Sequence, residues 1–457
     1  MAGTVKIRWV SAGVGLLAAL LPSRQPLHGG GPAVPRAALC CIAVAAVVAG
    51  CGSGPAAHAG HPGTSTQARA ASRSTAPVGK AAAATVSSLP AGQQGSWQQI
   101  PWAQVGPGWF LAVWSPNGPA STALFLIDPA GGRYLVEAIP ANSATPVLEA
   151  WSGDGQHALL HSPSVIFQGA STLGVLDLGT LVTTQFGFQN MFARFTAPDG
   201  QAIIAMVDNP LAPQPLLERI SLCGGLELSY PTSYAGGTSF NTGVLYSPDG
   251  TELAVGASTG IELMSNEGQG QRFLPINSSV QLCRPVRWWT PEELLAECSH
   301  YGLSEQLFLV PTSGATVTVL TASPTAPQDG GDLDALQLPS GTYVTDLAAW
   351  PGCGTSYVAS LQPDGLTAPV AIPGVPPGDG ATIVGAQGDR LAIASGPPGP
   401  YCSQVTTTLQ WFDPSTNSVT PLLGGTASSG QVPVPSSLLG TGTIDDVVMF
   451  GEPVSLP

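Results

Sequence analysis

Short apolar stretches separated by turn-forming residues run through most of the chain after residue 93. Between Gly200 and Gly250 four of them follow one another, namely AIIAMV, LLERIS, LELSY and FNTGVLY. Short runs of this kind, bounded by Gly, Pro, Asn and Asp, predict β-strands. The 57 Gly and 44 Pro among 457 residues disfavour long helices and favour tight turns. The pattern therefore predicts an all-β protein.

The turns between these stretches also recur along the chain. They read WSPNG at 114–118, WSGDG at 151–155, TAPDG at 196–200, YSPDG at 246–250, WTPEE at 289–293 and QPDG at 362–365. Their last positions lie 37, 45, 50, 43 and 72 residues apart. Four predicted strands in a period of about 45 residues are typical of one β-propeller blade.

The irregular steps fit the same repeat. WSPNG is predicted to close the second hairpin of its blade, and QPDG to fall late in a blade that begins with DLDALQL. We therefore predict a β-propeller at 94–457, with about seven four-stranded blades over 95–425 and six blades as the alternative. The later segment LLGTGTIDDVVMF is predicted to form a strand that helps to close the ring.

Each part of the repeated turn has a predicted structural task. Pro fixes φ, Asp accepts a backbone hydrogen bond from two residues on, and Gly adopts a positive φ. The aromatic residue before the turn is expected to pack between neighbouring blades. The acids of the turns are therefore expected to shape the backbone instead of performing chemistry. They are Asp154, Asp199, Asp249 and Asp364.

The repeat resembles that of TolB-type propellers. The shared features are the W/Y-S-P-D-G turn, a following strand of the form x-L-A-V, and a strand such as LFLIDPAGG or LQWFDPSTN. The resemblance covers most of 95–425 and departs from the pattern at Gly153, Ala197 and Glu293. It implies a binding platform in a bacterial envelope, and related blades also cap hydrolases.

The first 93 residues have a different character. An Arg, an apolar run and small residues precede Cys51 in PRAALCCIAVAAVVAGC, which is the order of a secretory signal. The stretch Val48-Ala49-Gly50-Cys51 resembles the lipobox of bacterial lipoproteins, which implies cleavage between Gly50 and Cys51 and a lipid on the Cys51 thiol. We predict a signal peptide at 1–50, with the true start near Val34, and a flexible tether at 51–93 that is rich in Ala, Gly, Ser, Thr and Pro.

Charge separates the two parts of the chain. Residues 1–93 contain seven cations and no acid, whereas residues 94–457 contain seven Arg, no Lys and 28 acids, a formal charge of −21 (7 − 28). A body of that charge is repelled by phosphate backbones, so nucleic acid is not an expected partner. The acidity is expected to keep the surface soluble, with a cation or basic partner as the alternative.

Five Cys follow Cys51 in the body. Cys283 and Cys298 are predicted to pair across a hairpin whose turn is Thr290-Pro291, because disulfides persist outside the cytoplasm. Cys353 and Cys402 form a second possible pair. Cys223 has no partner in this scheme, and an exchanged pairing such as Cys223 with Cys283 is an alternative.

The other candidates for chemistry have stronger structural interpretations. GASTG around Ser258 matches the G-x-S-x-G sequence pattern of a nucleophile elbow, but a predicted strand follows it where the elbow needs a helix. His157 and His161 share one face of a strand and are expected to lie at or between blade surfaces. Asp329, Asp332 and Asp334 could offer carboxylates to calcium, but their spacing departs from the EF-hand loop, and we expect them to be solvated loop acids. His58 and His61, which lie in the tether, are not expected to form a metal site. No metal or cofactor is predicted.

The combined features predict a membrane-anchored extracytoplasmic lipoprotein whose propeller binds an envelope protein, a peptide or a glycan. The alternative is a secreted propeller enzyme of the lactonase, lyase or glycosidase kind, with a site on the ring axis. Three or more carboxylates or His from different blades within coordination distance would favour the enzyme, since the fold alone does not decide function.

Overall fold

The structure is a computed structural model. It describes residues 89–116, 121–140, 145–162, 172–186, 190–207, 216–231, 243–277, 279–300, 305–323, 330–347, 355–398, 405–424 and 442–451. The chain divides into two compact units, Met1–Gln67 and Ala68–Pro457, and every described residue belongs to the second. The described helical elements include the 3-10 turns η1 (Trp97–Gln99) and η2 (Trp102–Gln104), and no helix in these ranges has the length and apolar character to cross a membrane.

The strands form six hydrogen-bonded sheets, and five of these are single propeller blades. Blade 1 contains β1 (Gln94–Ser96), β2 (Phe110–Ser115), β3 (Ala123–Ile127), β4 (Arg133–Ala138) and β29 (Thr443–Met449). Blade 2 contains β5 (Val147–Trp151), β6 (His157–Ser162), β7 (Thr172–Asp177) and β8 (Val182–Phe186). Blade 3 contains β9 (Asn190–Phe195), β10 (Ala202–Val207), β11 (Leu216–Ser221) and β12 (Leu226–Ser229). Blade 4 contains β13 (Val244–Tyr246), β14 (Glu252–Gly256), β15 (Gly260–Ser265) and β16 (Arg272–Pro275). Blade 7 contains β25 (Gly380–Gln387), β26 (Arg390–Gly396), β27 (Thr408–Asp413) and β28 (Ser418–Gly424).

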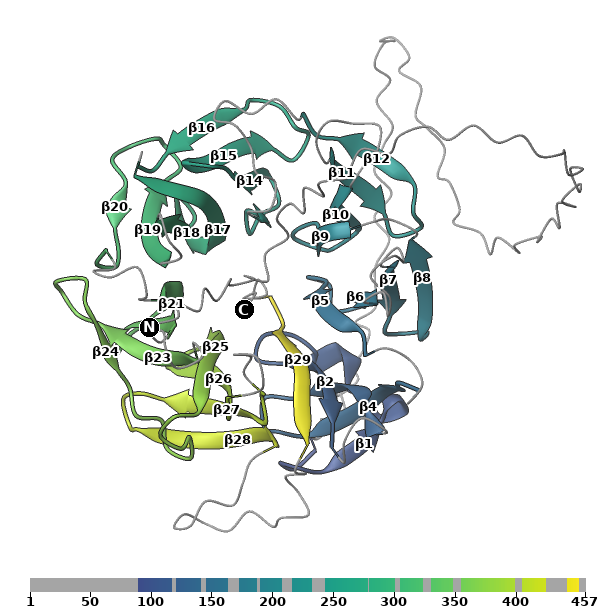
Figure 1. Cartoon of the computed structure of the whole chain (residues 1–457). Helices are drawn as coiled ribbons and strands as arrows, with labels where there is room; N and C mark the ends of the chain where they lie inside the picture. The colour runs from purple at the N-terminus through teal and green to yellow at the C-terminus, as the bar shows by residue number, and fades with distance from the viewer. Residues whose placement is uncertain are drawn as a thin grey trace, which may run out of the picture. The chain divides into compact units, whose positions relative to one another are not determined.

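The sixth sheet has eight strands and contains two blades. Blade 5 is β17 (Val280–Thr290), β18 (Glu293–His300), β19 (Glu305–Pro311) and β20 (Thr318–Val319). Blade 6 is β21 (Gly331–Leu338), β22 (Gly341–Leu347), β23 (Ser356–Leu361) and β24 (Thr367–Pro369). The two sets are joined through one parallel pair, Glu305 with Gly331, whereas strands within each set pair antiparallel. The described strands therefore group into seven blades, which Figure 1 shows as a ring.

The C-terminal strand completes the first blade. Strand β29 pairs antiparallel with β2, from Phe110 opposite Met449 to Ser115 opposite Thr443. It occupies the inner edge of blade 1, the position that the first strand has in the other blades (Figure 1). The predicted closing strand is thus present, and it explains why WSPNG follows the second strand of its blade and not the first.

The hydrophobic core lies between the blades. Seven buried clusters are present, and each takes its side chains from two neighbouring blades. An isolated blade cannot cover both of its faces, so this packing is what stabilises the ring. The aromatic residues before the repeated turns lie in four of these clusters, as predicted. They are Trp114, Trp151, Tyr246 and Trp289.

The repeated turns have the predicted hydrogen bonds at three of four acids. Asp154 and Asp249 accept a bond from the N–H two residues on, at 2.9 and 3.1 Å, and a second bond of 2.6 Å from the hydroxyl of Ser152 or Ser247. Asp364 accepts the corresponding bond from the N–H of Leu366 at 3.1 Å. These acids therefore shape turns.

Asp199 departs from this prediction, because its carboxylate accepts no such bond among the described residues. Ala197 stands where the other turns have Ser152 and Ser247, so the hydroxyl that holds the carboxylate is missing. The Thr196 hydroxyl instead accepts a bond of 3.1 Å from the N–H of Ala202. The turn keeps its shape through this substitute bond, and Gly200 still has a positive φ of 72°.

The two ends of the ring differ. First and second strands are joined by the short segments 152–156, 196–201 and 247–251, and we call this the turn end. Because neighbouring strands of a blade are antiparallel, second strands such as β6, β10 and β14 run to the opposite end, which we call the connection end.

Candidate functional site

Charged side chains gather on the inner strands of the ring. They are Glu149 on β5, Arg194 on β9, Arg284 on β17, Glu297 on β18 and Asp446 on β29, and we call them the inner charged cluster. They belong to blades 1, 2, 3 and 5. Arg194 and Arg284 are two of only seven Arg in residues 94–457. A polar group at these mostly apolar inner positions is informative, because burial of charge is costly unless it is compensated.

Arg284 and Glu297 form the central ion pair of the cluster. They lie directly opposite each other on β17 and β18, and the Arg284 Nε donates a bond of 2.7 Å to Glu297 Oε2. Burial raises the pKa of Glu297 to about 8, and the nearby carboxylate of Glu305 adds to the rise, whereas Arg284 opposes it. The pair therefore lies in a poorly hydrated place where charges interact strongly.

Arg194 connects the cluster across the ring. Burial lowers its pKa to about 10, Glu149 of blade 2 opposes that change, and the like charge of Arg284 from blade 5 adds to it. Residues from blades 2, 3 and 5 therefore interact electrostatically across the inner strands. The side chain of Arg194 is half-buried, so part of it stays accessible.

Two neighbours tie the cluster to blades 1 and 2. His161 Nδ1 lies 3.4 Å from Glu149 Oε1, and Asp446 Oδ2 accepts a bond of 2.7 Å from the N–H of Leu148. Burial raises the pKa of Asp446 to about 6, with contributions from Glu149 and Asp445. His157, four residues before His161, lies with its ring centroid 6.4 Å from that of Phe195 in blade 3. His157 therefore lies between blades, as expected, whereas the contact of His161 with Glu149 lies within blade 2.

Access to the cluster differs between the two ends of the inner strands. Toward the turn end, β5 and β13 finish in Trp151 and Tyr246, each 7% exposed. Toward the connection end, β5 begins at Val147 and β17 passes Leu282, which are 41% and 47% exposed. Val147 and Leu282 are therefore more exposed than Trp151 and Tyr246.

The disulfide beside the cluster joins Cys283 to Cys298. The predicted partners are right, but the predicted turn is wrong, because Thr290 pairs with Glu293 and the turn is Pro291-Glu292. Bulges in β17 shift the register, so the two Cys still lie close enough to bond. At one of these bulges the N–H of Cys283 donates a hydrogen bond of 2.9 Å to the carbonyl oxygen of Ala257. The exchanged pairing of Cys223 with Cys283 is therefore wrong.

Cys223 is also disulfide-bonded, so it is not the unpaired thiol that the sequence left over. Its partner is not among the described residues. Several other predictions also fall outside the described ranges and concern Gly50, Cys51, His58, His61, Asp329, Cys353 and Cys402.

The described residues contain no catalytic constellation of the predicted kinds. No group of three His, Cys, Asp or Glu among them could hold a metal ion. Ser258 lies between β14 and β15, two antiparallel strands, so the strand-turn-helix context of a nucleophile elbow is missing there. Two carboxylates of the inner charged cluster interact with Arg side chains, namely Glu297 with Arg284 and Glu149 with Arg194.

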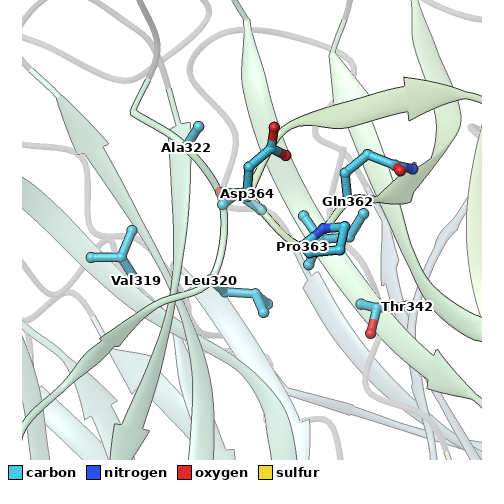
Figure 2. Close-up of a pocket in the computed structure, with 10 residues that line it drawn as sticks. Val319, Leu320, Ala322, Thr342, Gln362, Pro363 and Asp364 are labelled. Atoms are coloured by element: carbon cyan, nitrogen blue, oxygen red, sulfur yellow. The ribbon is translucent and has the colours of Figure 1, made fainter.

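A groove of about 570 Å³ lies between blades 5 and 6, near their outer strands (Figure 2). Figure 2 shows Gln362, Pro363 and Asp364 on one side and Val319, Leu320 and Ala322 on the other. Asp364 is already bonded within its turn. The groove therefore brings no unbonded acid or base into position.

Sequence reasoning missed the inner charged cluster. The signal was present, because Arg is rare in the body and yet occurs in MFARFTA and LCRPVRWW, two segments that supply first strands of blades. What the repeat could not reveal is that charges on separate blades interact, as Arg194 does with Glu149 and with Arg284. That relationship depends on the closed ring.

No protein family matches the sequence, and no curated protein is similar to it. Among solved structures, a prolyl endopeptidase is 14% identical, with a TM-score of 0.51 over 69% of this chain and 48% of its own. The propeller domain of the Trilobed protease from Pyrococcus furiosus is 11% identical, with a TM-score of 0.45 over 72% of this chain and 97% of its own. TolB from Acinetobacter baumannii is 14% identical, with a TM-score of 0.32 over 64% of this chain and 61% of its own. This chain spans about half the length of the endopeptidase, and the similarity concerns the propeller fold alone.

Proposed function

We propose that the protein is a lipoprotein anchored on the outer side of a cell membrane, whose propeller binds a protein or peptide partner at the connection end. The observation that carries the binding proposal is the inner charged cluster, in which Arg and carboxylate side chains from different blades lie together. The lipobox at Cys51 and the following tether support the anchoring part of the proposal.

A polypeptide is the class of ligand that suits this cluster. The half-buried guanidinium of Arg194 can donate to a ligand carboxylate, whereas Arg284 is held by Glu297, and Glu149 can accept from ammonium or guanidinium groups. A polypeptide carries both kinds of group. The charge of −21 on the body favours encounter with partners that have a basic surface, and this steering weakens as salt increases.

Photo-crosslinking in the full chain tests the position of the binding site. A photoreactive amino acid at Leu282, which is 47% exposed beside Arg284, is expected to capture a partner of defined mass from intact cells. The same residue at Val182, which is 62% exposed on the outer strand β8, is the matched control and is expected to capture none. Equal products from both positions, or none from Leu282, would refute binding at the connection end.

A second variant tests the cluster itself. Arg194→Gln in the crosslinking chain is expected to reduce the Leu282 product at least about tenfold, because loss of one bidentate charged contact costs about 1.5–3 kcal/mol. Arg272→Gln changes an exposed Arg of the outer strand β16 by the same chemistry and is expected to leave the product unchanged. An equal effect of both variants would point to general electrostatics and not to this cluster.

The anchor has a separate test. Cells that express the full chain and receive a radioactive or clickable fatty acid are expected to label the protein, and Cys51→Ser is expected to remove both label and membrane association. Retention of the label in Cys51→Ser would overturn the anchoring proposal. Because the Leu282 product is read independently of the lipid, the two parts of the proposal can fail separately.

A further inference from the structure

Two buried carboxylates lie opposite each other in blade 6. Asp332 on β21 pairs directly with Asp346 on β22, and the two residues are only 7% and 8% exposed. Asp332 and its neighbour Asp334 are therefore buried strand residues and not the solvated loop acids that the sequence predicts. Residues paired in this way have Cβ atoms about 4.5–5.5 Å apart, so like charges there repel strongly. Such a pair is stable only if a proton or a cation compensates it.

The hydrogen bonds around the pair are unequal. Asp346 Oδ2 accepts bonds from the Tyr357 hydroxyl at 2.7 Å and the Thr367 hydroxyl at 2.9 Å. The hydroxyl of Thr321 from blade 5 bonds to Asp332. The second oxygen, Asp332 Oδ1, is completely enclosed and has no hydrogen-bond partner.

No nearby cation neutralises Asp332 among the described residues. Asp334, two positions on, holds Arg287 in a bidentate pair at 2.9 and 2.5 Å. From blade 5, His300 is bonded to Gln306 at 2.6 Å, and Glu305 accepts the Ser299 hydroxyl at 2.9 Å. The described charged groups around the pair are therefore either acidic or already engaged.

A proton shared by the pair would neutralise only one of the two carboxylates, and Asp332 Oδ1 accepts no hydrogen bond from the described residues. A calcium ion carries two positive charges and binds carboxylate oxygens at 2.3–2.6 Å, so one ion can neutralise both members of the pair. The surrounding donors are carboxylate and hydroxyl oxygens, which suit a hard cation.

We propose that Asp332 and Asp346 form a calcium site between blades 5 and 6. The ion would neutralise the pair and stabilise the interface that has the smallest apolar core. That cluster contains four buried apolar residues, Leu295, Leu307, Ala335 and Val344, whereas the cluster between blades 7 and 1 contains fifteen. Magnesium is disfavoured, because a bound magnesium ion keeps several water molecules and Asp332 Oδ1 is not accessible to solvent.

Thermal unfolding of the full chain at pH 8 tests the site. Calcium at about 10 mM is expected to shift the folding equilibrium about ten- to a hundredfold, as for an extracellular site with a Kd of about 0.1–1 mM, and equimolar magnesium to shift it much less. Asp332→Asn, which keeps the shape of the side chain, is expected to abolish the difference between the two ions. Asp389→Asn, on the exposed turn between β25 and β26, is the control and should behave like the wild type.

Terbium luminescence provides a readout that does not depend on stability. Tyr357, which touches Asp346, is expected to sensitise bound terbium, calcium is expected to compete, and Tyr357→Phe is expected to lower the signal in a chain that still folds. Equal effects of calcium and magnesium, or an undiminished calcium effect in Asp332→Asn, would overturn the proposal. The proposal would also be wrong if calcium did not change the stability of the wild type, stability fell as pH rose, and Asp332→Asn removed that fall. A proton would then be what neutralises the pair.

Discussion

Asp446 and Leu148 connect the C-terminal strand to the second blade. The carboxylate of Asp446 accepts a bond of 2.7 Å from the backbone N–H of Leu148, at a buried position where blade 1 meets blade 2. Strand β29 is thus hydrogen-bonded to β2 on one side and fastened to β5 on the other. The side chain contributes to closure of the ring.

Asp446→Ala is expected to destabilise the protein by about 1–3 kcal/mol, because the buried N–H of Leu148 loses its acceptor. Asp446→Asn keeps an acceptor and is expected to lose less. Urea unfolding at pH 7 measures both. If the Ala and Asn variants were equally stable, the hydrogen bond would not matter for closure.

Arg287→Met is expected to cost about 3–5 kcal/mol, because it leaves the carboxylate of Asp334 buried and unpaired. The double variant Arg287→Met with Asp334→Leu is expected to recover most of that loss, since neither charge then remains. A double-mutant cycle in urea gives the coupling energy. Additive losses would show that the pair does not act as a unit.

Glu262 on β15 makes the stability depend on pH. It is 3% exposed, its Oε2 has no partner, and burial raises its pKa to about 7. The folded state holds this proton more tightly than the unfolded state, so the contribution to stability is complete at low pH and is lost as pH rises from about 4.5 to about 7.

Glu262→Gln is therefore expected to be up to about 3 kcal/mol more stable than the wild type at pH 8 and nearly equal to it at pH 4. Glu292→Gln, on the exposed turn between β17 and β18, is expected to show no such difference. Melting temperatures across this pH range provide the measurement. A Gln variant that follows the wild-type curve would argue against a buried, protonated Glu262.

Replacement of both Cys283 and Cys298 by Ala is expected to lower stability by about 3 kcal/mol, because the bridge closes a loop between residues 15 positions apart. The hairpin also holds Arg284 opposite Glu297, so the crosslink from Leu282 is expected to weaken in the same variant. Unfolding with and without reductant separates the effect of the bridge from that of the side chains.

Gly250→Ala is expected to cost more than about 2 kcal/mol. Its φ is 72°, and a β-carbon would lie 2.1 Å from the carbonyl oxygen of Ala197 in the next turn of the ring. Gly374→Ala is the matched control, because its φ is 83° but nothing lies within 4 Å of the added carbon. Equal losses at both positions would show that backbone conformation, and not contact between turns, sets the cost.

The fold could be predicted from the sequence because its information is local. Each turn such as YSPDG fixes its own backbone, and each strand shows its apolar pattern without reference to other blades. The register of β17 shows the limit of this reasoning. Its bulges, including Leu282 at a φ of 49°, arise from contact with Ala257 in the neighbouring blade, which no local pattern contains.

The inner charged cluster lies beyond that limit for the same reason. Glu149 and Arg194 occupy corresponding positions of successive blades, two residues before the turns that begin at Trp151 and Thr196, and only the closed ring brings Arg284 near Arg194. A repeat predicts what its copies share. Function in such proteins resides where the copies differ.

The position of β29 also sets the order of events during synthesis. Strand β2 is made more than three hundred residues before its partner β29, so its inner edge stays unpaired until the chain is almost complete. An apolar strand with an open edge is a template for unwanted pairing with other chains. We therefore expect blade 1 to stay open to such pairing until its last strand emerges.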